Sequence, residues 1–131
     1  MHPEHFLSRL QHDQIMEAIH RAERDTTGKI HVFVSHQIVA DALIAAQQRF
    51  ETMKIHELPH HNGILIFVAP RSQSFAVVGD QAVHDRVGDA AWQEVAKNMT
   101  HHFRQSQYTT GIVSAIEQLG ELLAVHFPKQ A

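Results

Sequence analysis

One continuous apolar segment constrains the fold of this chain more than any other feature. Gly63 to Ala69 reads Gly-Ile-Leu-Ile-Phe-Val-Ala, without a single polar side chain. A strand with one face in water alternates apolar and polar residues, whereas a strand covered on both faces is apolar throughout. The segment therefore predicts a central strand whose two faces are both covered by other elements.

The segments around this strand predict its neighbours in the sheet. Lys29 to His36 alternates apolar and polar residues, as a strand with two different faces does. After a turn at Pro70 to Gln73, Ser74 to Gly79 is expected to form a third strand. Because the connection is so short, this third strand and the central one most simply form a β-hairpin.

Apolar residues at helical spacing predict the remaining elements. Ser8 and Gln11 fit a capping box that opens the first helix. The four expected helices are Arg9 to Asp25, Val39 to Thr52, Asp89 to about Gln105, and one that starts at Thr109 or Thr110 and ends before Pro128. Met53 to Asn62 is expected to be a loop, and Asp80 to Asp89 to hold a short helical turn. Helices and strands in this order predict one small α/β domain over residues 1–131, with residues 1–7 as a loose N-terminal segment.

The composition excludes several classes of function. The formal net charge is -3 and Lys and Arg are scattered, which argues against binding to nucleic acid. There is no cysteine, so disulfides and thiol chemistry are excluded. No stretch approaches the length of a membrane helix, and no secretory signal opens the chain, so we expect a cytoplasmic protein without direct membrane insertion.

Histidine is abundant, with 13 in the chain, and one group resembles a zinc-protease motif. His56-Glu57-Leu58-Pro59-His60 matches the HExxH pattern, which works only when both histidines lie on one face of an α-helix. Pro59 removes a helical hydrogen bond and clashes with the preceding turn. We therefore reject a zinc-protease site and expect a polar loop.

The acidic stretch from Asp80 to Asp89 is the first candidate site. It begins where a buried strand ends, and its three carboxylates and His84 could supply ligands for a hard cation such as Ca²⁺ or Mg²⁺. The spacing does not match an EF-hand. The alternative is that Asp80 and Asp89 cap helices while Asp85 is solvated.

A second candidate group lies at other element boundaries. Asn62 directly precedes the central strand and could supply a carbonyl ligand at the same edge of the sheet. Asp41, at the start of the second helix, could converge on it from another segment. Ordinary turn and cap roles explain both residues equally well.

Several segments form an ordered set that belongs together. They are Ile15 to Glu23, Thr26 to Gly28, Asn62 to Ala69, Phe75 to Asp80, Asp89 with Trp92, and Phe103-Arg104 through Tyr108 to Gly111-Ile112. Taken in order, these segments resemble the TPM domain family. The resemblance covers nearly the whole chain from Phe6 to Pro128, and no single motif decides it.

The resemblance implies a three-layer α/β/α sandwich with a central sheet of about four strands. The fourth strand would be short, near Ser35 to Val39 or within the loop before Asn62. It also implies a divalent-cation site, usually described as calcium, a weak acid phosphatase activity as in some plant members, and a membrane partner such as a LemA-like protein. The cation ligands carried over are Asp80, Asp89 and Asn62, with Asp41 as a further candidate and His84 as a ligand or a phosphate contact.

This chain departs from the family pattern in ways that bear on the metal. Lys29 stands where an acidic residue usually follows the glycine, and His56 to His61 replace a glycine-rich segment. Added imidazoles favour a transition metal such as Mn²⁺ or Zn²⁺ over Ca²⁺.

Three functions follow from these observations. The first is a non-enzymatic interaction module that binds a divalent cation. The second is a metal-assisted phosphatase, with Asp80 or Asp89 as ligand or base and His84 as acid. The third is a purely structural domain whose acidic residues only cap helices.

Overall fold

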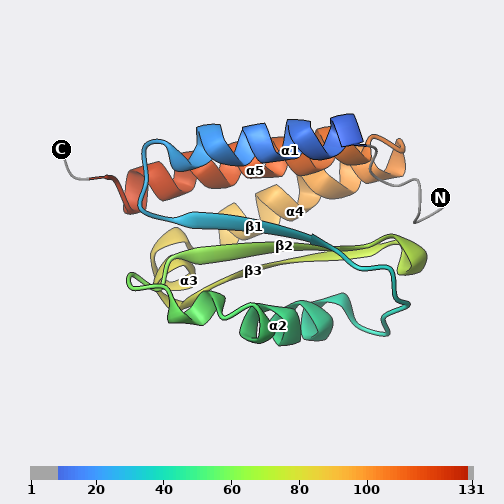
Figure 1. Cartoon of the computed structure of the whole chain (residues 1–131), viewed down its shortest axis with the longest axis horizontal. Helices are drawn as coiled ribbons and strands as arrows, with labels where there is room; N and C mark the ends of the chain where they lie inside the picture. Colours follow the sequence, from blue (N-terminus) through green and yellow to red (C-terminus); the bar gives the residue numbers. More distant parts are fainter. Residues whose placement is uncertain (1–8, 130–131) are drawn as a thin grey trace.

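Three strands form one sheet, and the apolar segment lies at its centre (Figure 1). The computed structural model describes residues 9–129. β2 (Gly63–Ala69) is parallel to β1 (Lys29–Val34) and antiparallel to β3 (Ser74–Gly79). The bounds of β2 and β3 are those that the sequence predicts, and so is their hairpin pairing.

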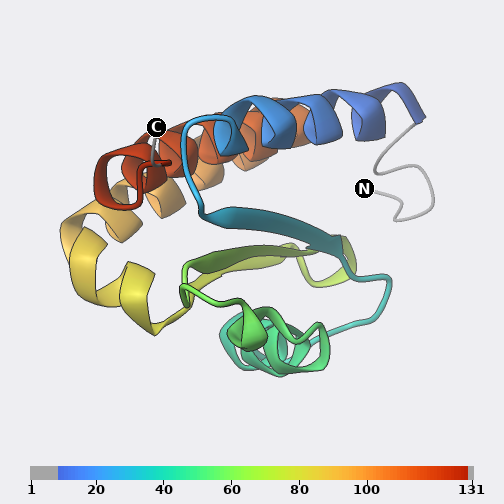
Figure 2. The same cartoon turned by 60° about the vertical axis from the view of Figure 1, so that its left-hand side comes forward.

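Helices lie on both sides of this sheet. Their bounds are α1 Arg9–Glu23, α2 Ala42–Thr52, α3 Gln81–Val87, α4 Asp89–Arg104 and α5 Tyr108–His126, with short 3₁₀ turns η2 Ile55–Glu57 and η3 Pro70–Ser72. The turned view separates α2, below the sheet, from α1 and α5, above it (Figure 2).

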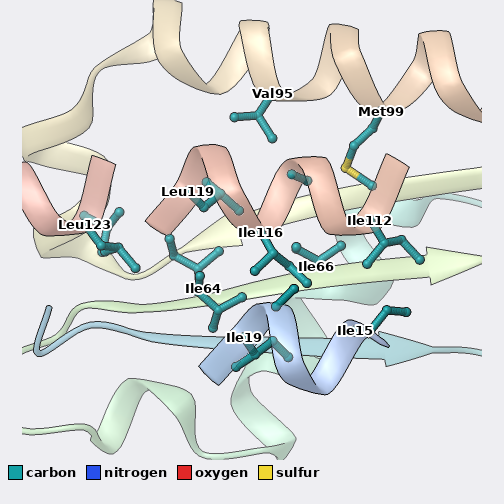
Figure 3. Packing of buried hydrophobic residues seen from close by; sticks show 14 of the residues in the cluster. Ile15, Ile19, Ile64, Ile66, Val95, Met99, Ile112, Ile116, Leu119 and Leu123 are labelled. Atoms are coloured by element: carbon teal, nitrogen blue, oxygen red, sulfur yellow. The ribbon is translucent and has the colours of Figure 1, made fainter. Parts of the chain in front are cut away.

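Alternate residues of β2 enter two separate cores. Ile64, Ile66 and Val68 pack with α1, α4 and α5, where Figure 3 shows Val95 and Met99 of α4 pointing toward the side chains of α5. Leu65, Phe67 and Ala69 pack on the other face with α2 and η2. All six of these β2 side chains are at most 3% exposed. The apolar run is therefore explained by a strand that is covered on both faces.

A buried threonine in the turn between α1 and β1 forms hydrogen bonds with the end of α5. The hydroxyl of Thr26, which is fully buried, donates to the carbonyls of Leu123 at 3.1 Å and Phe127 at 2.5 Å. It also accepts from the backbone N–H of Gly28 at 3.0 Å. The last and first parts of the described chain are thereby joined at the end of the sheet where β1 and β2 begin.

The α/β class is confirmed, but the expectation of about four strands is wrong for residues 9–129. The N–H of Ser35 still donates to the carbonyl of Val68 in β2 at 2.8 Å, but the next backbone donors bind side chains instead of a further strand. The N–H of Gln37 donates to the hydroxyl of Ser35 at 3.2 Å, and that of Val39 to the hydroxyl of Ser72 at 2.8 Å. The loop before Asn62 forms η2, so neither predicted location holds a strand.

Other expectations differ from the structure by a few residues. α1 ends at Glu23, β1 at Val34, and α5 begins at Tyr108, earlier than the threonines predicted. The rejection of the HExxH motif is confirmed, because η2 ends at Glu57 and Leu58 is extended. The predicted cap at Ser8 and the loose segment 1–7 lie outside the described residues. Within residues 9–129, no helix has the length and apolar character needed to cross a membrane.

His31 is a half-buried titratable group on the α2 face of β1. Burial of the ring lowers the pKa of His31 below its usual 6.5; the nearby Glu23 carboxylate raises it in part and Lys29 lowers it further. Its ring Nε2 is buried and has no hydrogen-bond partner among the described residues. Folding therefore favours the neutral imidazole.

The first prediction concerns the core between α4 and α5. Met99 is fully buried, and Met99→Ala should lower the free energy of unfolding by about 2–5 kcal/mol, since the substitution removes buried carbon and leaves a cavity. Urea unfolding measures it. Met16, which is 45% exposed on α1, gives the matched control: Met16→Ala should change stability by less than about 0.5 kcal/mol. Equal losses in the two variants would contradict this assignment of the core.

The second prediction concerns pH. Between the lowered pKa of His31 and 6.5, the unfolded chain binds more protons at this position than the folded chain. The stability that neutral His31 contributes to the folded state is thus fully present above pH 6.5. It is lost as the pH falls from 6.5 toward the lowered pKa of the folded chain. We expect the free energy of unfolding to fall less on acidification in His31→Gln than in the wild type. An unchanged slope in His31→Gln would refute the assignment.

Candidate functional site

Asp80 lies where β3 ends and α3 begins, and its side chain is only 12% exposed. Its carboxylate Oδ1 accepts from the backbone N–H of Gln81 at 2.8 Å and so caps α3. The backbone N–H of Asp80 donates to the carbonyl of Gly63 at 2.9 Å, which continues the β2–β3 pairing by one residue. The residue is therefore held firmly at one end of the sheet.

The second carboxylate oxygen of Asp80 has no such partner. Oδ2 is buried and accepts no hydrogen bond from the described residues. The nearest charge partner is the ring Nδ1 of His61 at 3.5 Å, a contact that is an ion pair only when the ring is protonated. A buried carboxylate oxygen without a hydrogen bond is costly, so this atom is an open acceptor that a cation would satisfy.

His61 reaches Asp80 through an uncommon backbone conformation. Its φ is 50°, in the left-handed region, and its N–H donates to the carbonyl of Leu58 at 3.1 Å. Histidine tolerates this region better than most non-glycine residues do. This conformation changes the direction of the chain between η2 and the start of β2. It leaves the imidazole largely exposed beside the carboxylate.

Asn62 lies at the same end of the sheet but already has a structural role. Its side chain is 1% exposed, and its amide nitrogen donates to the hydroxyl of Thr27 at 2.9 Å. Its backbone carbonyl accepts from the N–H of Lys29 at 3.4 Å. Asn62 therefore joins the turn before β1 to the first residue of β2.

A cavity of about 540 Å³ lies at this end of the molecule. It brings together the loop before β2, α3 and the residues at the end of α5, and it is lined by Thr27, His60, Ala82, Arg86, His126, Phe127, Pro128 and Lys129. Arg86 donates to the carbonyl of His126 at 3.0 Å, and its guanidinium carbon lies 4.7 Å from the centre of the Phe127 ring. The arginine thus serves mainly to hold α3 against the end of α5.

The remaining predicted site residues make no hydrogen bond or ion pair with the carboxylate of Asp80. Asp89 is the first residue of α4, whose N-cap is Gly88, and it is exposed. His84 is exposed one turn into α3, although its backbone N–H donates to the carbonyl of Asp80 at 3.0 Å. Both are near Asp80 in the chain, but no contact joins their side chains to it.

Asp41 lies at the opposite end of the sheet. It caps α2, where its carboxylate accepts from the N–H groups of Leu43 at 2.9 Å and Ile44 at 3.1 Å. α2 follows the end of β1, whereas Asp80 follows β3 at the end where β1 and β2 begin (Figure 1). A strand of this length spans about 20 Å, so one ion cannot bind both carboxylates.

No group of three or more His, Cys, Asp or Glu side chains is arranged to hold a metal ion within residues 9–129. What the structure does bring together is Asp80 and His61, a pair that the sequence argument missed. In the sequence, the histidines from His56 to His61 indicate a preference for a transition metal but do not identify His61 as the residue beside Asp80. The available signal was position: His61 precedes β2 by two residues, and Asp80 follows β3, so the hairpin pairing places both at one edge.

The chain is similar to several proteins of known structure. A protein-family model described as the TPM domain matches residues 1–122. The BA42 protein of the psychrophilic bacterium Bizionia argentinensis, solved by NMR, is 31% identical over 95% of this chain and 86% of its own, with a TM-score of 0.89.

Two more distant structures share the fold. The N-terminal domain of a P. gingivalis protein is 16% identical over 96% of this chain and 83% of its own, with a TM-score of 0.75. The N-terminal domain of cg2496 from Corynebacterium glutamicum is 15% identical over 89% of this chain and 74% of its own, with a TM-score of 0.70. None of the curated protein sequences compared matches this chain. The family match, together with the identity to BA42, shows that the chain belongs to the TPM domain family.

Proposed function

We propose that this chain is a non-enzymatic interaction module that binds a divalent cation, with Asp80 as the anchoring ligand and His61 as the second. The observation that carries the proposal is the buried Oδ2 of Asp80, which accepts no hydrogen bond from residues 9–129 and lies 3.5 Å from the imidazole Nδ1 of His61. Two separate cores on the two faces of one sheet support the idea that a three-layer α/β/α sandwich holds this pair in place.

The pair of donors favours a transition metal. Ca²⁺ and Mg²⁺ prefer oxygen ligands, whereas an imidazole nitrogen beside a carboxylate suits Mn²⁺ or Zn²⁺. The expectation of calcium came from the family resemblance, and of the oxygen ligands carried over with it Asp41 lies at the opposite end of the sheet and Asp89 has no ion pair or hydrogen bond with Asp80. Water would complete the coordination shell, because the imidazole of His61 is 63% exposed. The cytoplasmic location stays a prediction.

A metal-assisted phosphatase is less well supported by the same geometry. Phosphoryl transfer depends on cations that position and neutralise the phosphate. The two arginines nearest to such a role have other partners: Arg86 donates to the carbonyl of His126 at 3.0 Å, and Arg71 to that of His36 at 3.4 Å. Neither contact points to Asp80, so we favour binding over catalysis.

The third prediction tests the cation. Mn²⁺ or Zn²⁺ should raise the thermal unfolding midpoint in a saturable way, with stabilisation of about 2.7 kcal/mol at one hundred times the dissociation constant. Asp80→Asn should abolish the effect, because asparagine caps a helix as well as aspartate does but carries no charge. His61→Gln should weaken the response to Zn²⁺ more than that to Mg²⁺.

Asp85→Asn is the matched control for this experiment. Asp85 lies exposed on α3, close to Asp80 in the chain, and its replacement should leave the response to each ion unchanged. Absence of any shift with Ca²⁺, Mg²⁺, Mn²⁺ or Zn²⁺ at millimolar concentration would refute the proposal. A shift that survives Asp80→Asn would place the cation elsewhere.

The fourth prediction concerns the partner. The resemblance to the family supports a LemA-like membrane protein, and we propose that the cation-loaded chain binds it more tightly than the cation-free chain. Calorimetric titration of the soluble part of such a protein, with and without saturating Mn²⁺, measures the difference. Equal affinity with and without Mn²⁺ would show that the cation does not affect partner binding. No binding in either condition would exclude this partner.

A further inference from the structure

A second cavity, of about 590 Å³, lies at the end of the sheet opposite to Asp80. The cavity lies between two connections, the one that joins β2 to β3 and the turn between α4 and α5. Both connections lie at the same end of the molecule (Figure 1). Its volume falls within the range of small-molecule sites. The Phe103-Arg104 to Tyr108 segment, on which part of the family resemblance rests, lines it, and the cation proposal leaves that segment without a role.

Three aromatic rings give this cavity a fixed apolar wall. Phe75, paired with Val68 across the hairpin, meets the ring of Phe103 edge to face at 5.4 Å between centroids. The ring of Phe103 meets that of Tyr108 in the same way, also at 5.4 Å. Edge-to-face contacts of this kind hold rings in defined orientations. The wall therefore suits a flat or branched apolar group.

The charge of the cavity has one sign. Among the described residues that line it, Arg104 is the only charged one. It is exposed and makes no hydrogen bond or ion pair with the described residues. The hydroxyl of Ser74, another lining residue, does not contribute, because Ser74 pairs with Ala69 and its side chain points to the α2 face of the sheet, opposite to Phe75. The guanidinium of Arg104 is the group of this cavity that favours an anion with oxygen acceptors.

The backbone at the rim is also unusual. Of the four non-glycine residues with positive φ in the described chain, two line this cavity: Gln73 at 47° and Ser106 at 60°. Left-handed conformations at residues other than glycine are costly and tend to gather at binding sites. They sit in the two connections that face each other across the cavity.

We infer that this cavity binds a small carboxylate with an aromatic or branched apolar body. The apolar body would lie against Phe75, Phe103 and Tyr108, and the carboxylate would accept hydrogen bonds from the guanidinium of Arg104. A planar carboxylate matches the paired N–H groups of arginine, which makes the contact directional as well as electrostatic. The site is separate from the cation site, because Asp80 lies at the other end of β3.

Titration with phenylacetate tests this inference. In ¹H–¹⁵N NMR spectra of the full chain at constant ionic strength, phenylacetate should cause saturable shifts in the amides of residues 68–75 and 100–108. The neutral 2-phenylethanol, which keeps the ring and loses the carboxylate, should bind about tenfold more weakly. Equal dissociation constants for the two probes, or no saturable shift in these segments, would overturn the inference.

Single substitutions test whether Arg104 binds the carboxylate of phenylacetate. Arg104→Gln should raise the dissociation constant for phenylacetate about tenfold, and Arg104→Lys, which keeps the charge but not the planar fork, should lie between it and the wild type. Arg24→Gln, an identical change at an exposed arginine outside the cavity, and Asp80→Asn should both leave the constant unchanged. An unaltered constant in Arg104→Gln would refute the carboxylate assignment, whatever the outcome of the metal titrations.

Discussion

The burial of β2 on both faces is the constraint on which the rest of the structure depends. Its two sets of alternate side chains are enclosed by different helices, so the sheet is stable only when α1, α4 and α5 cover one face and α2 the other. Since both faces of β2 are apolar, alternation along the strand cannot set its register against its neighbours. A short loop and a side-chain contact do so instead: the connection between Ala69 and Ser74 fixes the register of β3, and the amide nitrogen of Asn62 donates to the hydroxyl of Thr27 at 2.9 Å next to β1.

Residues at this end of the sheet therefore serve the fold before they serve any ligand. Asn62 and Thr26 are buried, and their side chains make hydrogen bonds that join the turn before β1 to β2 and to the end of α5. Asp80 differs, because its carboxylate has two oxygens and the helix cap uses only Oδ1. The structural and the cation-binding interpretations of Asp80 are thus compatible, since each concerns a different atom.

The sequence predicts the strands well where a pattern repeats and poorly where single contacts decide. The uninterrupted apolar run determines β2, and the short connection after it determines the hairpin with β3. The predicted fourth strand is absent partly because the N–H of Val39 donates to the hydroxyl of Ser72. Ser72 lies 33 positions further along the chain, so no local pattern around Val39 indicates this contact. Likewise, Asp41 and Asn62 both precede an element, and only the direction of α2 shows that they lie at opposite ends. His61 was missed because its contact with Asp80 depends on a left-handed residue in a loop without periodicity.

The two ends of the β2–β3 hairpin differ in chemistry while sharing one rigid element. One end carries a carboxylate and an imidazole, and the other carries aromatic rings and a single arginine. Between them the six side chains of β2 are almost wholly buried, so the hairpin cannot bend without opening a core. A ligand at either end would therefore stabilise the same pair of strands. The stabilisation free energies of the two ligands add when the two sites are independent. They depart from additivity only when binding of one ligand moves the part of the hairpin that the other ligand contacts.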